Sequence, residues 1–269
     1  MKYKTHARTH KITIAMNSWV ARNIYEVFDI AKAKAFNGIE LDTNYIPLPI
    51  SFSDLSRVKK FVSQSGIRLR FHGHNIDVEI SHKSKFLRQT SLDFLKIYVD
   101  LINKIGGNYL VVHVGYPHEE CKIEYAIKNL RNLVEYGEER GVTVSLENSC
   151  KGFTSNPFHF LEILNKSHAQ ATFDIGHSNT SDWVKYEKGT PVEFLRLVKK
   201  YVTNAHIYLM ETEEQVHLPP RNIDEIRLVL DELLDTSCDW WTIELANIRE
   251  LIKTKRVLDA YLSESRTHF

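Results

Sequence analysis

The feature that most constrains the fold of this chain is an alternation of short apolar runs with amphipathic segments, repeated eight times. Apolar runs bounded by turn residues predict buried strands, and apolar residues at every third or fourth position predict helices. The predicted strands are residues 11–17, 39–42, 67–72, 108–114, 142–147, 170–174, 202–209 and 240–245. The predicted helices are residues 25–36, 52–65, 91–105, 123–140, 157–166, 191–201, 223–234 and 248–263. This alternation predicts a parallel sheet that is covered by helices.

The length of the chain favours a closed barrel over an open sheet. The chain has 269 residues, and a (β/α)8 barrel typically takes about 250. No stretch rich in proline, glycine and serine divides it. We therefore expect one α/β domain over residues 11–269, a (β/α)8 TIM barrel with a core of eight parallel strands. Residues 1–10 are polar and basic, and we expect them to form a flexible arm.

Composition and charge argue against several classes of function. The 35 Lys and Arg nearly balance the 34 Asp and Glu, for a formal net charge of +1. This balance argues against nucleic acid as a partner. We find neither a run of about 18 apolar residues, as a transmembrane helix needs, nor a signal peptide. The three cysteines, Cys121, Cys150 and Cys238, lack Cys-x-x-Cys spacing. These features predict a cytoplasmic protein with reduced thiols and no membrane contact.

Six of the apolar runs end on residues of the kinds that bind metals. An unpaired charge is costly to bury, so acids and histidines in these places need an explanation. In a (β/α)8 barrel the carboxyl ends of all eight strands meet at one rim, which is where active sites of this fold lie. We therefore expect these side chains to converge there. The residues concerned are His72, His113, Glu147, Asp174, His206 and Glu244.

Four of these residues come from the fifth to eighth predicted strands in turn: Glu147, Asp174, His206 and Glu244. Three carboxylates and one imidazole around a point suit a divalent cation, and their negative charge would be hard to accommodate without one. The oxygen-rich set favours Mn²⁺, Mg²⁺ or Co²⁺, although further histidines would draw Zn²⁺.

Each of these four residues also has an ordinary structural interpretation. Glu147 could be a salt-bridge partner, Asp174 a helix cap, His206 a hydrogen-bonded core residue, and Glu244 a neighbour of packed tryptophans. All four interpretations would have to hold together at consecutive strand ends, so we favour the metal site. For three other residues at strand ends the structural interpretation is preferred: Glu40, Asp42 and His74.

The remaining histidines leave alternatives open. His177 follows Asp174 by three residues, and it could bind a second metal ion, orient Asp174 or contact the substrate. His72 and His113 could serve a second metal ion or the substrate.

The sequence resembles the xylose isomerase-like barrel superfamily, which groups sugar (phosphate) isomerases and epimerases with DNA-repair enzymes of the endonuclease IV type. Asp174-Ile-Gly-His177 and His217-Leu-Pro-Pro220 are the most specific motifs. The other segments that carry the resemblance are Gly38-Ile-Glu-Leu41, Phe71-His72-Gly73, Leu110-Val-Val-His113-Val-Gly115, Leu146-Glu147-Asn148, Ala205-His206-Ile207, Ile223-Asp224 and Ile243-Glu244.

The resemblance implies a role for each matched residue. Glu147, Asp174, His206 and Glu244 would hold a divalent metal ion, and in epimerase members Glu147 and Glu244 also flank the substrate as an acid/base pair. His177 would contact the substrate or the metal ion. In members with three metal ions, the positions that match His72, His113 and His217 are also ligands.

The segment that follows the seventh predicted strand departs from the family pattern. His206-Ile-Tyr-Leu209 replaces an acidic run, and Arg221-Asn222 replaces a glycine-rich segment. Arg221 could meet a phosphate or carboxylate of the substrate. Endonuclease-type members have a further acidic ligand near the position of His217, for which Glu213 and Glu214 are the candidates here.

Our leading hypothesis is a divalent-metal-dependent isomerase or epimerase of a small sugar or sugar derivative, which acts through proton transfer and an enediolate. The alternatives are an endonuclease IV-like zinc phosphodiester hydrolase acting on DNA, and a non-catalytic metal-binding barrel. The sequence is compatible with a homo-oligomer. It does not specify the substrate, its phosphorylation or the number of metal ions, nor whether the protein is active with the altered segment 209–221.

Overall fold

The computed structural model describes residues 11–46, 48–73, 78–115 and 118–267 and confirms the predicted (β/α)8 barrel. The predicted arm, residues 1–10, lies outside the described residues, as does His74. Eight strands close into a barrel in the order β1-β10-β7-β6-β5-β4-β3-β2, and every pair is parallel. The strands are β1 Thr13–Asn17, β2 Gly38–Asp42, β3 Arg68–His72, β4 Tyr109–Val112, β5 Thr143–Glu147, β6 Gln170–Asp174, β7 Val202–Ile207 and β10 Trp240–Ile243.

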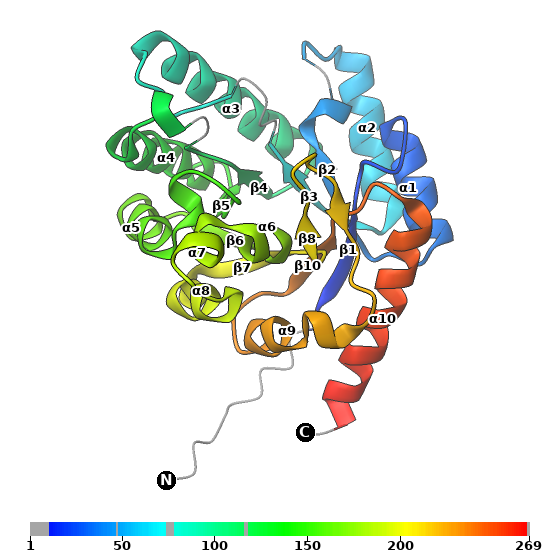
Figure 1. Cartoon of the computed structure of the whole chain (residues 1–269). Coiled ribbons are helices and arrows are strands. Elements are labelled where there is room, and N and C mark those ends of the chain that lie inside the picture. The colour runs from blue at the N-terminus through cyan, green and yellow to red at the C-terminus, as the bar shows by residue number, and fades with distance from the viewer. Residues whose placement is uncertain (1–10, 47, 74–77, 116–117, 268–269) are drawn as a thin grey trace.

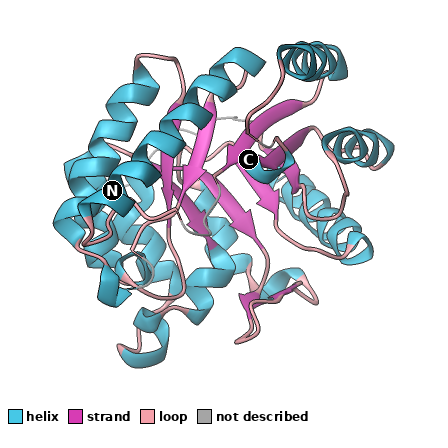
Figure 2. Ribbon diagram, turned by 90° about the horizontal axis from the view of Figure 1, so that it is seen from above, coloured by secondary structure: helices cyan, strands magenta, loops and turns pink. Residues whose placement is uncertain are grey.

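Helices surround the barrel, as Figures 1 and 2 show from two directions. The helices that connect successive strands, with the one that closes the chain, are α1 Ile24–Ala33, α2 Phe52–Ser65, α3 Lys85–Ile105, α4 Ile123–Glu138, α5 Pro157–Ser167, α8 Pro191–Val198, α9 Arg227–Leu234 and α10 Ile248–Thr267. Among the described residues, no helix is both long and apolar enough to span a membrane.

Local sequence signals explain where several helices begin and end. The side chains of Asn23 and Ser51 accept hydrogen bonds from backbone amides in the first turns of α1 and α2, which satisfies donors that have no partner inside a helix. α8 has a capping box between Thr190 and Glu193. α2 ends at Gly66, whose φ of 69° lies in the left-handed region that glycine adopts without strain.

The structure contains short elements that hydrophobic periodicity does not reveal. Two helices, α6 Ile175–Thr180 and α7 Asp182–Tyr186, follow β6 directly, and a two-stranded hairpin follows β7. The hairpin pairs β8 Met210–Glu211 with β9 His217–Leu218 in antiparallel fashion. The seventh strand therefore ends at Ile207 and not at Leu209. Both additions lie at the carboxyl ends of strands, where they extend the rim of the barrel.

The amino ends of the strands form the opposite face of the barrel. A cavity of about 820 Å³ opens there, and Arg68, Arg70, Thr203 and Asp239 are among its lining residues. Both arginines bind Asp239, at 3.0 and 2.9 Å. None of the six predicted strand-end residues lines this cavity. This face of a TIM barrel usually serves stability, and active sites of this fold lie at the other end.

Candidate active site

The four predicted metal ligands meet at the carboxyl end of the barrel. Glu147 and Asp174 are the last residues of β5 and β6, His206 lies in β7, and Glu244 directly follows β10. All four are buried, and one ligand atom from each lies within 4.8 Å of the others. His206 Nδ1 is 3.2 Å from Glu147 Oε1 and 3.5 Å from both Asp174 Oδ2 and Glu244 Oε2. The predicted convergence of these four side chains is therefore present.

Two atoms of this set are buried without a hydrogen bond, Asp174 Oδ2 and His206 Nδ1. A buried polar atom that lacks a partner costs about 1–3 kcal/mol, and more if it is charged. Burial, and then the nearby carboxylates of Glu147 and Asp174, raise the pKa of Glu244 to about 8, although His206 opposes the rise. We call Glu147, Asp174, His206 and Glu244 the first donor set. A divalent cation among them would bind the two unpartnered atoms and offset the negative charge of the three carboxylates, so the set fits a metal ion.

Asn148 holds two of these strand ends in place. Its side-chain nitrogen donates to the carbonyl oxygen of Asp174 at 2.9 Å, and its side-chain oxygen accepts from the amide of Asp174 at 2.8 Å. The other oxygen of the Asp174 carboxylate, Oδ1, accepts from the backbone amide of His177 at 2.6 Å, at the start of α6. Asp174 is thus the helix cap that its sequence allows and a member of the donor set as well.

A second donor set consists of His72, His113 and Glu147, and it shares Glu147 with the first. Glu147 Oε2 lies 3.2 Å from His72 Nε2 and 3.2 Å from His113 Nε2, and the two imidazole nitrogens are 3.1 Å apart. His72 ends β3, and His113 directly follows β4. The two oxygens of Glu147 therefore face different donor sets, as in carboxylates that bridge two metal ions. Burial is the largest single effect and lowers the pKa of His72, but the carboxylates of Glu147, Glu244 and Glu40 together raise it to about 9.

A third donor set consists of His177, Glu211 and His217. His177 Nε2 is 2.8 Å from Glu211 Oε2, and the β8–β9 hairpin pairs Glu211 with His217. His217 Nδ1 lies 2.9 Å from the carbonyl oxygen of Glu244, which connects this set to the first. The acid beside His217 is thus Glu211, which the sequence pattern did not reveal. The candidates expected from the sequence, Glu213 and Glu214, are exposed in the turn of the hairpin and belong to no possible donor set among the described residues.

Tyr208 occupies the position at which the sequence departs from the family pattern. Its ring is buried and stacks on His217, with 3.8 Å between the ring centres and 2° between the planes. Its hydroxyl has no hydrogen-bond partner among the described residues. Burial, followed by the nearby carboxylates of Asp174 and Glu244, raises the pKa of this hydroxyl well above its usual value. Tyr208 therefore contributes a neutral aromatic wall between the first and third donor sets.

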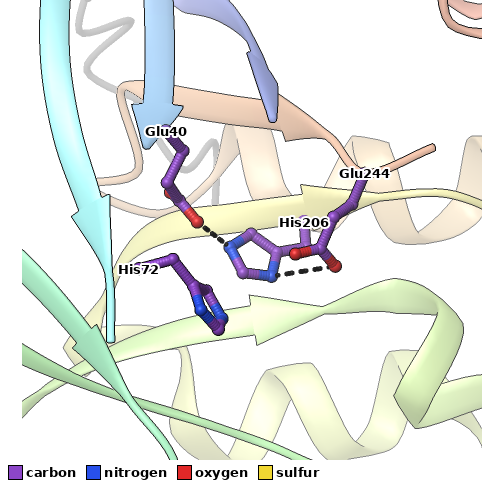
Figure 3. Close-up of side chains that lie close together, drawn as sticks. All are labelled: Glu40, His72, His206 and Glu244. Carbon is purple, nitrogen blue, oxygen red and sulfur yellow. Dashed lines mark hydrogen bonds and ion pairs between the residues drawn. The ribbon is translucent and has the colours of Figure 1, made fainter. Parts of the chain in front are cut away.

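Three further residues show what the sequence patterns could and could not place. Glu40 lies outside the site predicted from the sequence, but the structure places its Oε1 2.6 Å from His206 Nε2 (Figure 3). Asp42 accepts a hydrogen bond from the Asn44 amide at 2.8 Å, which agrees with the structural role preferred for it. Arg221 is exposed, and its backbone amide donates to Glu225. The predicted contact between Arg221 and the substrate stays a prediction.

The chain is similar to known proteins in sequence and in fold. The family model of the xylose isomerase-like TIM barrel matches residues 28–254. The protein MJ0008 of Methanocaldococcus jannaschii is 34% identical over 180 residues, which cover 66% of this chain and 77% of that protein.

Solved structures show the same fold at low sequence identity. A D-tagatose 3-epimerase-like protein has a TM-score of 0.79 and 21% identity over 96% of this chain and 99% of its own. An L-ribulose 3-epimerase has a TM-score of 0.75 and 14% identity over 96% of each chain. The IOLI protein, solved with a zinc atom, has a TM-score of 0.73 and 16% identity over 94% of this chain and 99% of its own.

Proposed function

This chain belongs to the xylose isomerase-like TIM barrel family, and we propose that it is a divalent-metal-dependent isomerase or epimerase of a small sugar or sugar derivative. The observation that carries the proposal is the convergence of Glu147, Asp174, His206 and Glu244 on one buried point. The epimerases among the structural neighbours support the same class of chemistry, although their low identity speaks only for the fold.

The four residues of the first donor set would hold the metal ion. The excess of carboxylates over imidazoles favours Mn²⁺, Mg²⁺ or Co²⁺, while the adjoining histidines and the zinc atom of the IOLI protein keep Zn²⁺ open. When bound, such an ion polarises adjacent carbonyl and hydroxyl oxygens of a substrate as a Lewis acid.

Glu147 and Glu244 would carry out the proton transfers. They extend from β5 and β10, which β6 and β7 separate in the wall of the barrel, so a bound substrate would have one carboxylate on either side. One carboxylate takes the proton from the carbon next to the carbonyl, and the other returns a proton to the resulting enediolate. His72, His113 and His177 lie at the same rim and would donate hydrogen bonds to substrate oxygens.

Exchange of substrate hydrogen with solvent tests these assignments. The protein is incubated in D₂O with Mn²⁺ and a panel of ketoses, aldoses and inososes, and deuterium incorporation is followed by NMR. We expect wild-type protein to exchange hydrogen with at least one compound and Glu147→Gln and Glu244→Gln to show no exchange. Asp42→Asn removes a carboxylate at the same rim that lies outside the donor sets, and it should exchange normally. A Glu147→Gln or Glu244→Gln variant that exchanges at the wild-type rate would refute the acid/base assignment.

The three adjoining donor sets favour a second candidate function, phosphodiester hydrolysis of the endonuclease IV type. Glu211 supplies the acidic residue that this class requires beside His217, and Glu147 connects two of the sets. Closely spaced metal ions suit phosphoryl chemistry because they stabilise both the attacking and the leaving oxygen. A net charge of +1 argues against it, since phosphate contacts supply much of the affinity for DNA.

Metal content and substrate separate the two candidates. Inductively coupled plasma mass spectrometry on protein purified without chelator should find about one equivalent of metal for the isomerase and two or three of zinc for the hydrolase. Cleavage of a duplex with one abasic site, measured at low salt, gives the second readout. Cleavage that disappears in Glu147→Gln would favour hydrolysis, and intact DNA with sugar exchange would favour isomerisation.

A further inference from the structure

We propose that Glu40 is a positioning residue that fixes the tautomer of His206, so that Nε2 carries the proton and Nδ1 is left to bind the metal ion. Glu40 lies in β2, on the other side of the barrel interior from β7, and both side chains are buried. Figure 3 shows the Glu40 carboxylate at one nitrogen of the His206 ring and Glu244 at the other. The inference rests on the metal site of the proposed function and not on any particular substrate.

The Glu40 carboxylate is held by hydrogen bonds on the side away from His206. Its Oε2 accepts from Asn204 Nδ2 and from Thr242 Oγ1, each at 3.0 Å. Both donors are themselves fixed, because Asn204 Oδ1 accepts from Arg70 Nη1 and Thr242 Oγ1 accepts from Trp240 Nε1, each at 2.9 Å. Two donors therefore point at Oε2, and Oε1 remains for the imidazole.

The short contact between Glu40 and His206 excludes a competing interpretation. Glu40, His72, His206 and Glu244 also form a possible donor set, in which Glu40 would itself be a ligand. Two ligand atoms that share one metal ion, at about 2.0–2.2 Å each, lie about 3 Å or more apart. Glu40 Oε1 and His206 Nε2 are only 2.6 Å apart, which is the distance of a short charge-assisted hydrogen bond.

The hydrogen bond with Glu40 determines which nitrogen of His206 carries the proton and which has the lone pair that can bind a metal ion. An ionised carboxylate only accepts, so Nε2 must supply the proton. A neutral imidazole with its proton on Nε2 has a lone pair on Nδ1, the atom that faces Glu147, Asp174 and Glu244. Carboxylates that hold metal-binding histidines in this way typically account for a 10- to 100-fold gain in metal affinity.

Glu40→Gln should reverse the tautomer with little change in shape. Asn204 and Thr242 both donate toward the Oε2 position, so the amide oxygen of the new side chain would lie there. The amide nitrogen would then face His206 Nε2, which would have to accept, and the ring proton would move to Nδ1. That proton would point at the metal position and oppose binding.

The first test is the affinity for Zn²⁺ and Co²⁺, measured by competition with a chelator. We expect Glu40→Gln to bind either ion about 10- to 100-fold more weakly than wild type. Ser145→Ala is the matched control, because Ser145 is equally buried in β5 and its hydroxyl, which pairs with Thr172 Oγ1 at 2.8 Å, contacts neither Glu40 nor His206 in the described network. Its metal affinity should stay at the wild-type value. Equal affinities of wild type and a folded Glu40→Gln variant would overturn the proposal.

The second test needs no variant to fold. In zinc-loaded wild-type protein labelled with ¹⁵N, NMR should show the proton of His206 on Nε2 and no proton on Nδ1. A proton on Nδ1 would overturn the proposal, as would a wild-type protein that binds no divalent ion. If zinc binds and the tautomer is as expected but no sugar exchanges hydrogen, the positioning role of Glu40 stands and only the proposed function fails.

Discussion

Replacing Gly176 by alanine should destabilise the protein far more than an ordinary glycine substitution. A Cβ atom at position 176 would lie 1.9 Å from Cε2 and 2.3 Å from Cζ of Tyr208. Ordinary carbon contacts need about 3.5 Å, so the ring would have to move by roughly 1.5 Å. It is buried and stacked on His217, so it has no open space on the opposite face. We expect a loss of about 3 kcal/mol, at the upper end of the cost of overpacking a core.

Urea unfolding in the presence of chelator measures this loss separately from metal binding. Gly141→Ala is the control, because a Cβ atom at position 141 would meet no described atom within 4 Å, and only the φ of 67° resists substitution. It should cost about 1 kcal/mol. Loss of order in Tyr208 should also displace His217, so Gly176→Ala should disturb the third donor set.

A double-mutant cycle would show whether the clash with Tyr208 is the cause. In a Tyr208→Ala background the ring is absent, and Gly176→Ala should then cost little. The coupling free energy between the two substitutions should be about 2 kcal/mol, within the range for residues in contact. The reasoning is wrong if Gly176→Ala costs no more than Gly141→Ala, or if it costs the same with and without the Tyr208 ring.

Three further predictions concern the donor sets. Free metal at about 100 times its Kd should raise the free energy of unfolding by about 2.7 kcal/mol, and Glu147→Ala/Asp174→Ala should abolish that gain in a thermal-shift assay; an equal gain in the variant would contradict the first donor set. Metal-free protein should lose stability as the pH rises from about 4.5 to 8, because the raised pKa of Glu244 lets the folded state hold a proton that the unfolded state releases; urea midpoints that rise over this range would disagree. Glu211→Gln should remove one equivalent of metal if the third donor set binds an ion, and an unchanged stoichiometry of two or more equivalents would exclude it.

The barrel and the position of its active rim follow from local sequence alone. Continuous apolar runs such as residues 109–112 are too uniform for an exposed strand, and their alternation with amphipathic segments leaves few folds other than a parallel barrel. Once the barrel is given, every strand end lies at one rim, so Glu147, Asp174 and Glu244 could be placed together without knowing a distance. The predicted strand ends at His72, Glu147 and Asp174 agree with the structure.

What the sequence alone could not provide depends on contacts between distant segments. Glu211 reaches His177 only because β8 and β9 pair as a hairpin, and a strand of two residues is too short to have a periodicity. A signal was available, since an acid six residues before His217 would pair with it across a short turn.

The hydrogen bond between Glu40 and His206 likewise forms only because the barrel closes. The two residues are 166 positions apart and lie on strands that are not neighbours in the barrel. In the sequence Glu40 is an ordinary acidic residue of a predicted strand. Its side chain meets the imidazole of His206 only because both residues point into the interior of the barrel. The sequence determined which residue types reach the rim, because strand periodicity is a local property. The tertiary structure decided which atoms face one another, because distances across a closed barrel are set by all eight strands at once.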